Sequence, residues 1–249
     1  MTPNKYIKEV EETLSRLSTS TAAEREQIRR YIGTEFSVLG LSSQVQKQAC
    51  KTGFSFYHTD KEMTFRTFDG IYRLGKTHEA KNQAFIFLDQ NYRHVAATTQ
   101  MSVLPSWVKG VDNWAHSDYL SKFLSRLLEH PDTGSAMMKQ LKAWNSSANP
   151  WERRQSLVSL YYYARTKTNH VDFKTTTKLV SPLLEDKAYY VQKAVGWTLR
   201  ECYNVYKREA FDFMEAQHRR ISSVAFTAAI EKMSDKEKNH LKQLRRKRA

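Results

Sequence analysis

The sequence predicts an all-α fold in which short helices stack in pairs, an α-solenoid of the HEAT type. Two observations support this prediction. Gly and Pro are scarce, at 8 and 5 of 249 residues. Apolar residues recur at helical spacing along nearly the whole chain, and few segments alternate as strands do. Many short helices without strands are typical of stacked helix pairs. A compact helical domain without repeats remains the alternative.

Helix start signals occur along the chain. The first apolar stripe consists of Tyr6, Val10, Leu14 and Leu17. A hydroxyl residue followed three positions later by glutamate fits the capping box, in which the two side chains satisfy backbone amides reciprocally. This pattern occurs at Thr21 with Glu24, at Thr59 with Glu62 and at Ser234 with Glu237. These signals predict roughly a dozen helices of about 10–18 residues.

Two asparagines are further cap candidates. Asn113 precedes a helix expected to begin at Trp114, and Asn149 precedes Pro150, which suits the first helical position. Glycines are expected where helices stop or turn, at Gly53, Gly75 and Gly134. We expect one helical repeat domain over residues 1–236 and a basic helix end or tail over residues 237–249. The tail is expected to fray.

The spacing of three tryptophans bears on the repeat length. Trp114 and Trp151 are 37 residues apart, and Trp151 and Trp197 are 46 apart. These intervals bracket the HEAT repeat length of about 40–47 residues.

The chain is strongly basic, with a formal net charge of +14 and a sequence pI of about 9.7. Residues 150–249 hold 21 Lys and Arg against 11 Asp and Glu, so most of the surplus lies in the last two fifths. Such a surplus favours an acidic polymer or an anionic membrane surface as partner. No apolar run approaches the about 18 residues that span a bilayer. With no signal-peptide core at the N-terminus, we expect a cytoplasmic protein without a membrane partner.

Common enzyme signatures are missing from the sequence. We find no phosphate loop, dinucleotide glycine fingerprint, zinc pair or serine elbow. The eight histidines have no ligand spacing and are interpreted as ordinary core or surface residues. Cys50 and Cys202 also lack metal-ligand spacing, so we expect free buried thiols in a reducing compartment and no metal.

Trp114 and Asp118 form the first candidate site. They are four residues apart and share one face of the predicted helix. One interpretation is a core tryptophan beside a solvated carboxylate in the first turn, where the helix dipole favours it. The other is an aromatic platform beside an anion, which suits a developing cation.

The second candidate lies at a predicted helix start. Trp151, Arg153 and Arg154 follow the Asn149-Pro150 cap, where backbone amides and adjacent arginines could hold a phosphate. A solvated charged turn is the structural alternative.

The third candidate is a helical face formed by Tyr190, Lys193 and Trp197. It mixes aromatic and cationic groups, although helix packing with a snorkelling lysine explains it equally. Gly196 costs a helix interior about 1 kcal/mol relative to Ala, so it indicates close approach of a neighbouring helix or a ligand.

These segments together resemble the AlkD-like alkylpurine DNA glycosylases, which are HEAT-like repeat DNA alkylation repair enzymes. Residues 192–201 match the family's segment QKA-[IV]-GW-x-LRE, the most specific of the similarities. Residues 114–118 match W-x-x-x-D, and residues 151–154 are similar to W-x-x-R. Residues 30–40 are similar to the family's RY…F…LG segment. The motifs follow the family's order from Tyr31 to Trp197.

The resemblance implies a curved stack of HEAT-like helix pairs with duplex DNA in its concave groove. It implies a DNA glycosylase of base excision repair that hydrolyses the glycosidic bond of purines alkylated at N3 or N7. By matched position, Asp118, Trp114 and Trp197 form the catalytic trio. The DNA-binding residues are expected to be Arg154, Arg153, Lys193, Tyr31 and Tyr190. No cofactor is implied, and we expect a nucleoid-associated monomer.

This chemistry has a physical basis. A purine alkylated at N3 or N7 is positively charged and already a good leaving group, so no strong general acid is needed. The sugar becomes oxocarbenium-like as the bond breaks, and a fixed carboxylate stabilises that cation. Tryptophan faces offer electron-rich surfaces to a cationic sugar or base. The resemblance also implies that the base need not be flipped out of the helix.

The chain departs from the family's pattern at three positions. Asn113 stands where the family often has an aromatic residue, and His116 stands where a small or polar residue is expected. Pro105 is expected to kink the helix before the site. Two rival functions remain open: a non-catalytic nucleic-acid-binding scaffold, and a HEAT module that binds other proteins.

Overall fold

The computed structural model describes residues 4–162 and 169–246. Within these ranges the chain forms α-helices, short 3-10 turns and loops, and one isolated parallel bridge joins Ser37 and Thr77. The described helices group into two compact units, Met1–Leu120 and Ser121–Ala249, and the border falls inside helix α7 (Trp114–Glu129). The prediction of an all-α fold is therefore confirmed.

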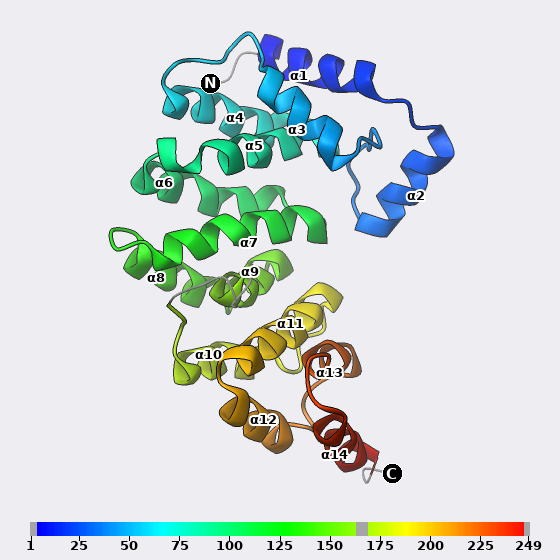
Figure 1. The fold of residues 1–249 in the computed structure, drawn as a ribbon, viewed down its shortest axis with the longest axis vertical. Helices are drawn as coiled ribbons and strands as arrows, with labels where there is room; N and C mark the ends of the chain where they lie inside the picture. Colours follow the sequence, from blue (N-terminus) through cyan, green and yellow to red (C-terminus); the bar gives the residue numbers. More distant parts are fainter. Residues whose placement is uncertain (1–3, 163–168, 247–249) are drawn as a thin grey trace. The chain divides into compact units, whose positions relative to one another are not determined.

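The first unit is built around helix α5, which contacts α1, α3 and α4 (Figure 1). Its elements before α7 are α1 (Asn4–Leu17), α2 (Ala22–Ile32), α3 (Ser43–Thr52), α4 (Lys61–Leu74), α5 (His78–Asn91), η1 (Tyr92–His94), α6 (Ala97–Trp107) and η2 (Val108–Gly110). In α1 the predicted stripe is buried at Val10 and Leu14, but Leu17 at the end of the helix is 44% exposed. Pro105 lies in the last turn of α6, which ends two residues later.

Aromatic rings fill the core of the first unit. Phe68 of α4 stacks on Phe87 of α5 with ring centroids 4.9 Å apart. Tyr72 stacks on Trp107 at 4.3 Å, and its hydroxyl donates to the Trp107 carbonyl at 2.9 Å. Each ring removes a large apolar area from water, so these contacts bind α4, α5 and α6 together.

The second unit is built around helix α11, which contacts α9, α10, α12 and α13. Its elements after α7 are α8 (Gly134–Trp144), α9 (Pro150–Tyr161), α10 (Phe173–Val180), η4 (Ser181–Leu183), α11 (Tyr189–Val205), α12 (Lys207–Ala216), α13 (Ser223–Ala229) and α14 (Asp235–Arg246). Gly196 explains the closest contact of this unit. A Cβ at Gly196 would lie 2.3 Å from the carbonyl oxygen of Ala225 in α13. The glycine is therefore required by a neighbouring helix, one of the two predicted causes.

Two of the three predicted capping boxes are confirmed. Thr21 and Glu24 bond reciprocally at the start of α2, with the Thr21 amide donating to the Glu24 carboxylate at 2.7 Å. Ser234 and Glu237 bond in the same way at the start of α14. The asparagine caps are also confirmed, since Asn149 Oδ1 accepts from the Trp151 amide at 2.9 Å.

The capping box predicted at Thr59 and Glu62 is wrong. Asp60 is the N-cap of α4, and its carboxylate accepts from the Glu62 amide at 2.8 Å. Glu62 instead accepts from the Ala96 amide at 2.8 Å and from the Thr99 hydroxyl at 3.0 Å, which fixes the start of α6. A tertiary contact thus takes the glutamate that the local pattern assigned to a cap.

The basic C-terminal segment is helical as far as Arg246, so its expected fraying is not seen in the described residues. Leu241 is fully buried, and the Arg245 guanidinium donates to the carbonyls of His218 and Ile221 at 2.7 and 2.6 Å. The domain boundary expected after residue 236 falls within the first turn of α14. That boundary stays a prediction.

Candidate functional site

Trp114 and Asp118 lie in the first turns of α7, as the sequence predicted. Asn113 caps this helix, because its Oδ1 accepts the backbone N–H of His116 at 2.9 Å. Trp114 is the first helical residue, and Asp118 follows one turn later on the same side of the helix. Both side chains are half-buried, so Trp114 is not a fully enclosed core residue.

Tyr31 and Trp114 are in direct contact in the first unit. The Trp114 indole N–H donates to the Tyr31 carbonyl at 3.2 Å. The two rings meet edge to face at 5.6 Å, an arrangement that aromatic pairs favour. Tyr31 is 74% exposed, so this pair presents an aromatic surface to the exterior of its unit. Two residues predicted for the site from distant motifs are therefore brought together.

Asp112 holds the segment after α2 against the start of α7. Its carboxylate accepts the Thr34 hydroxyl at 2.8 and 2.9 Å, the Glu35 amide at 2.8 Å and the Asn113 side-chain amide at 2.7 Å. This role of Asp112 was not predicted from the sequence. Only its position next to the Asn113 cap could have indicated a role.

His116 is a core residue, as the general interpretation of the histidines predicted. It is completely buried and stacks on the ring of His78 with centroids 4.2 Å apart. Burial lowers the pKa of His116 well below its ordinary value, and the neighbouring His78 lowers it further. Both imidazoles are therefore neutral near pH 7.

In the second unit, Arg154 supports the aromatic pair formed by Trp151 and Tyr190. The Arg154 guanidinium is buried and donates to the Tyr190 carbonyl at 2.9 Å. Trp151 stacks on Tyr190 at 5.0 Å, and Tyr189 beside them is 57% exposed. Burial raises the pKa of the Tyr190 hydroxyl, with Tyr189 adding to the rise and Arg154 opposing it.

Arg153 has a fixed set of partners. Its guanidinium pairs with Asp186 at 2.6 and 3.2 Å and donates to the carbonyls of Ser147 and Ala148. This ion pair joins the start of α9 to the loop before α11. Arg153 is thus anchored by protein groups, although only its DNA contact was predicted.

Trp197 is half-buried on α11. The Arg200 guanidinium lies 5.8 Å from its ring centroid and also pairs with Glu201 and Glu231 at 3.2 and 2.6 Å. The Tyr162 ring is 6.4 Å away, and Lys193 one turn earlier is exposed. The aromatic and cationic face predicted for this helix is therefore present in the second unit.

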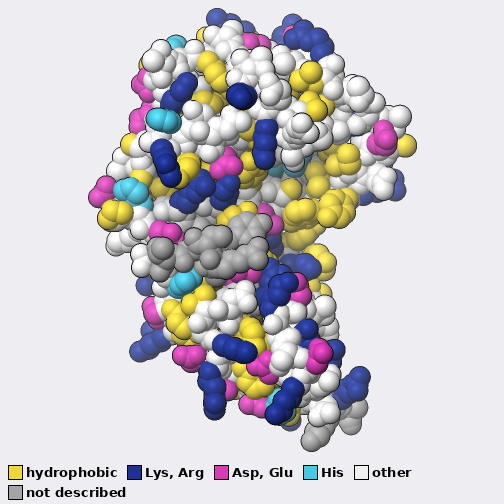
Figure 2. Space-filling view, in the orientation of Figure 1, with side chains coloured by type: hydrophobic (Ala, Val, Ile, Leu, Met, Phe, Trp, Pro, Cys, Tyr) yellow, Lys and Arg dark blue, Asp and Glu magenta, His cyan; other side chains and the backbone are white. Residues whose placement is uncertain are grey.

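The predicted site residues thus form two sets, each described within its own unit. The first surface consists of Tyr31, Trp114 and Asp118. The second surface consists of Arg154, Tyr190, Lys193 and Trp197. Figure 2 shows Lys and Arg side chains on the visible face of both units, interspersed with fewer Asp and Glu. Lys and Arg side chains are therefore exposed to solvent on each unit.

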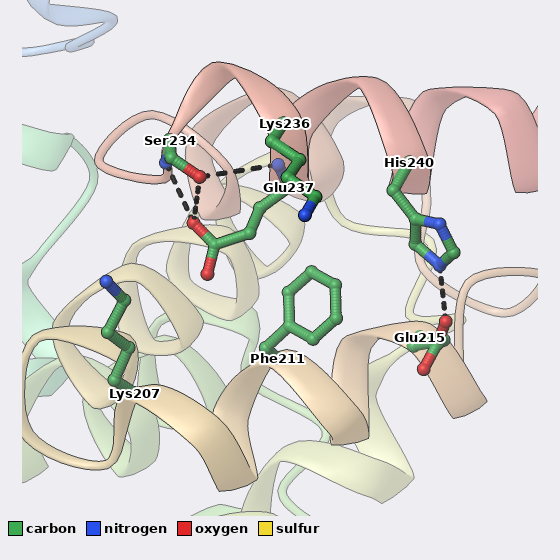
Figure 3. Close-up of a pocket in the computed structure, with 7 residues that line it drawn as sticks. All are labelled: Lys207, Phe211, Glu215, Ser234, Lys236, Glu237 and His240. Atoms are coloured by element: carbon green, nitrogen blue, oxygen red, sulfur yellow. Dashed lines mark hydrogen bonds and ion pairs between the residues drawn. The ribbon is translucent and has the colours of Figure 1, made fainter.

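A cleft of about 500 Å³ lies between α12 and α14, and none of its lining residues is a predicted site residue (Figure 3). The Phe211 ring points into it, with Lys207 on one side and His240 on the other. Its two carboxylates already have partners. Glu237 accepts from Ser234 and from the Tyr203 hydroxyl, and Glu215 pairs with His240. We interpret these contacts as structural, because they hold α14 against α12.

The described residues contain no cluster of three or more His, Cys, Asp or Glu side chains that could hold a metal ion. None of the helices in the described ranges combines the length and hydrophobicity needed to cross a bilayer. Cys50 and Cys202 are free and buried, as predicted, and burial raises the pKa of each thiol to about 12.

Comparison with known proteins gives one family. A family model described as DNA alkylation repair enzyme matches residues 10–233. A solved structure described as a predicted DNA alkylation repair enzyme from Enterococcus faecalis is similar with a TM-score of 0.65 at 16% identity, covering 88% of this chain and 98% of that one.

Two further solved structures come from Streptococcus mutans. AlkD2 aligns with a TM-score of 0.50 at 17% identity, over 88% of this chain and 96% of its own. The protein smu.31 of strain UA159 aligns with a TM-score of 0.50 at 16% identity, over 94% and 96%. At these identities the structural similarity shows a shared fold. No curated protein matches the chain.

Proposed function

The chain belongs to the DNA alkylation repair enzyme family, and we propose that it is a DNA N-glycosylase that releases cationic N3- or N7-alkylated purines from duplex DNA. One observation carries this proposal. The matched region contains both candidate surfaces, including Tyr31, which is 74% exposed and contacts Trp114, and Asp118, which follows Trp114 by one helical turn. We further propose that the protein acts as a monomer and needs no cofactor.

Asp118 is assigned the electrostatic role. As the bond between C1′ and the alkylated purine breaks, positive charge moves from the base to the sugar. A carboxylate fixed on a helix stabilises this charge without reorganising during the reaction. The neutral purine leaves, and a water molecule adds to C1′ and loses a proton. The lesion's own charge supplies much of the activation.

The aromatic residues are assigned to contacts with the positively charged sugar or base. Trp114 offers a half-buried ring face beside Asp118, and its hydrogen bond to Tyr31 fixes the plane of the indole. Ring faces attract cations by about 0.5–2 kcal/mol, depending on desolvation. By its motif, Trp197 is assigned the same role, that of an electron-rich face for a cationic sugar or base.

Binding to the duplex is assigned to the remaining predicted residues. Lys193 is exposed and can pair with a phosphate, and Tyr31 and Tyr190 can pack against sugars. For Arg154 we propose a phosphate contact through its planar guanidinium, which is buried and also donates to the Tyr190 carbonyl. For Arg153 we propose a secondary contact with DNA, since its guanidinium is already paired with Asp186.

The test is excision by the Asp118→Asn variant. The change is nearly isosteric and removes one negative charge, so the fold and DNA affinity should persist. Losing one preorganised electrostatic partner costs about 3–4 kcal/mol, a factor of about 100–1,000 in rate. The loss of rate should be smaller here, because the charged leaving group already supplies much of the activation. Release of 7-methylguanine and 3-methyladenine is measured in single turnovers, with DNA affinity measured on the same samples.

A matched control is Asp132→Asn, which neutralises a carboxylate that is 72% exposed in the loop after α7. This variant should excise at the wild-type rate. Slower release with unchanged or tighter binding identifies Asp118 as a group used in the transition state. Equal rates for wild type and Asp118→Asn remove Asp118 from the site.

The same assay separates a glycosylase from a binding scaffold. A scaffold binds methylated duplex in a salt-dependent way but releases no base. A module for protein partners shows no steep salt dependence, because no condensed counterions are released from DNA. Release of methylated purine by the wild-type chain excludes both alternatives.

A further inference from the structure

We propose that Asp112, Asn113 and His116 form a positioning relay at the start of α7, and that the relay works only while His116 is the neutral tautomer with its proton on Nε2. This proposal rests on the proposed function for its effect on base release. Its hydrogen bonds and tautomer can be tested independently of any activity.

The orientation of the Asn113 amide is fixed twice. Its Oδ1 accepts the backbone N–H of His116 at 2.9 Å, so the oxygen must point into the helix. Its Nδ2 lies 2.7 Å from the Asp112 carboxylate, an acceptor that requires an N–H. A flipped amide would break both contacts and leave polar groups unsatisfied inside the protein, since Asn113 is fully buried.

This orientation determines the tautomer of His116. Asn113 Nδ2 carries two hydrogens and cannot accept, and its second contact is His116 Nδ1 at 3.1 Å. His116 Nδ1 must therefore be the acceptor and carry no proton. The proton of the neutral ring then sits on Nε2, which lies 3.3 Å from the carbonyl oxygen of His78 and donates to it.

The relay connects the buried imidazole to the candidate surface. Asp112 accepts the Thr34 hydroxyl and the Glu35 amide, while Trp114 donates to the Tyr31 carbonyl. Hydrogen bonds thus hold residues 31–35 to residues 112–114 through the Tyr31 carbonyl, the Thr34 hydroxyl and the Glu35 amide. The orientations of the Tyr31 and Trp114 rings depend on these hydrogen bonds.

Burial and two neighbouring groups, His78 and Lys81, oppose a second proton on His116. From α5, His78 stacks on its ring and Lys81 is buried nearby, with its pKa lowered to about 8 mainly by burial. From α4, the Tyr72 ring lies 6.4 Å away. Glu79 of α5 already accepts the amides of three residues, Leu39, Gly40 and Leu41.

A protonated His116 would place its Nδ1–H against the Asn113 amide nitrogen, with donors on both sides. If the Asn113 amide flipped to offer Oδ1 to this proton, Oδ1 would leave the backbone N–H of His116 and face the Asp112 carboxylate. The first turn of α7, with Trp114 and Asp118, would lose its cap. His116 thus acts through Asn113 and Asp112 as a positioning residue.

The first experiment measures the tautomer. Nitrogen NMR of the histidine rings at pH 7.5 should show His116 with Nδ1 unprotonated and Nε2 protonated. The indole N–H resonance of Trp114 is followed in the same samples, assigned by its absence from Trp114→Phe. As the pH falls, both signals should change in one titration. A proton on Nδ1 at pH 7.5 overturns the proposal.

The second experiment compares two variants of His116. His116→Leu removes the acceptor for Asn113, whereas His116→Asn keeps an acceptor near the Nδ1 position and cannot titrate. His116→Leu should shift the Trp114 indole resonance and slow base release about 10- to 100-fold, as expected for displacing a site group by about 1 Å. His116→Asn should keep the resonance at every pH tested and most of the rate.

Thr34→Val tests the other end of the relay and covers the case in which His116→Leu does not fold. It removes one hydroxyl donor to Asp112 with little change of shape, and it should shift the same indole resonance. If Thr34→Val and His116→Leu leave both resonance and rate unchanged, the relay is refuted. If wild type keeps the tautomer but releases no base, only the proposed glycosylase function fails.

Discussion

Gly196→Ala should destabilise the second unit, although alanine is the better helix former. The added Cβ would lie 2.3 Å from the Ala225 carbonyl oxygen and 2.9 Å from two other backbone atoms of Ala225. Ordinary contact begins at 3.4 Å, so α11 and α13 must separate by about 1 Å. No side-chain rotation can relieve this contact, because all three neighbours are backbone atoms.

The magnitude follows from two opposing effects. Replacing glycine in a helix interior gains about 1 kcal/mol. Overpacking costs typically about 1–3 kcal/mol, and a rigid backbone neighbour places the cost at the upper end or beyond. The separation also loosens Ala225 and Ala229, which are buried against α11. We expect a net loss of about 1–2 kcal/mol, or a decrease in Tm of about 3–8 °C.

The assay is thermal unfolding of the variant beside a matched control. Gly70→Ala changes another helix-interior glycine, in the middle of α4, where Gly70 is half-exposed. It should be neutral or slightly stabilising. Gly196→Ala melting at or above the wild-type temperature would refute the argument, because it would mean that α13 does not approach α11 this closely.

Three further predictions concern the candidate surfaces and the buried histidines. Arg154→Ala should weaken DNA binding and also lower the free energy of unfolding, since a buried hydrogen bond from a charged group contributes about 1.5–3 kcal/mol. Lys193→Ala changes an exposed residue and serves as the control, because it should weaken DNA binding at an unchanged Tm. Fluorescence anisotropy measures the binding of both variants, and thermal melting measures their stability. Trp197→Phe should fold normally yet lower the single-turnover excision rate by about 3- to 30-fold, and full activity would deny the indole a special role. Because burial lowers the folded-state pKa of His78 and His116 below 6.5, the unfolded chain binds protons that the folded chain does not. The free energy of unfolding should therefore be highest above about pH 6.5 and decrease below it by up to about 1.4 kcal/mol per pH unit for each histidine. Urea titrations at several pH values measure this loss, and an unchanged free energy of unfolding across that range contradicts the prediction.

The fold could be predicted because its signals are local. Helical periodicity, the caps at Thr21, Ser234 and Asn149, and the scarcity of Gly and Pro are all read within a few residues. The error at Thr59 has the same origin. A capping box and a tertiary contact compete for the carboxylate of Glu62, and only the folded chain reveals Ala96 and Thr99 as its partners.

The candidate site was predicted only in part, since its support comes from distant segments. Thr34 and Asp112 are 78 positions apart, and no local pattern announces their hydrogen bond. Asp186 pairs with the Arg153 guanidinium from 33 positions away, and no local pattern announces this ion pair. Tyr31 and Trp114 were linked by resemblance alone, and their contact required the fold.

The two departures from the family pattern near the site are not independent of each other. Asn113 stands in place of an aromatic residue and His116 in place of a small or polar one, and the structure joins them in one buried pair. Asn113 alone would leave a buried N–H without an acceptor, and His116 alone would leave a buried ring nitrogen without a donor. Each unsatisfied group costs about 1–3 kcal/mol, whereas the pair satisfies both. The two departures from the family pattern therefore support each other, and together they fix the first turn of α7.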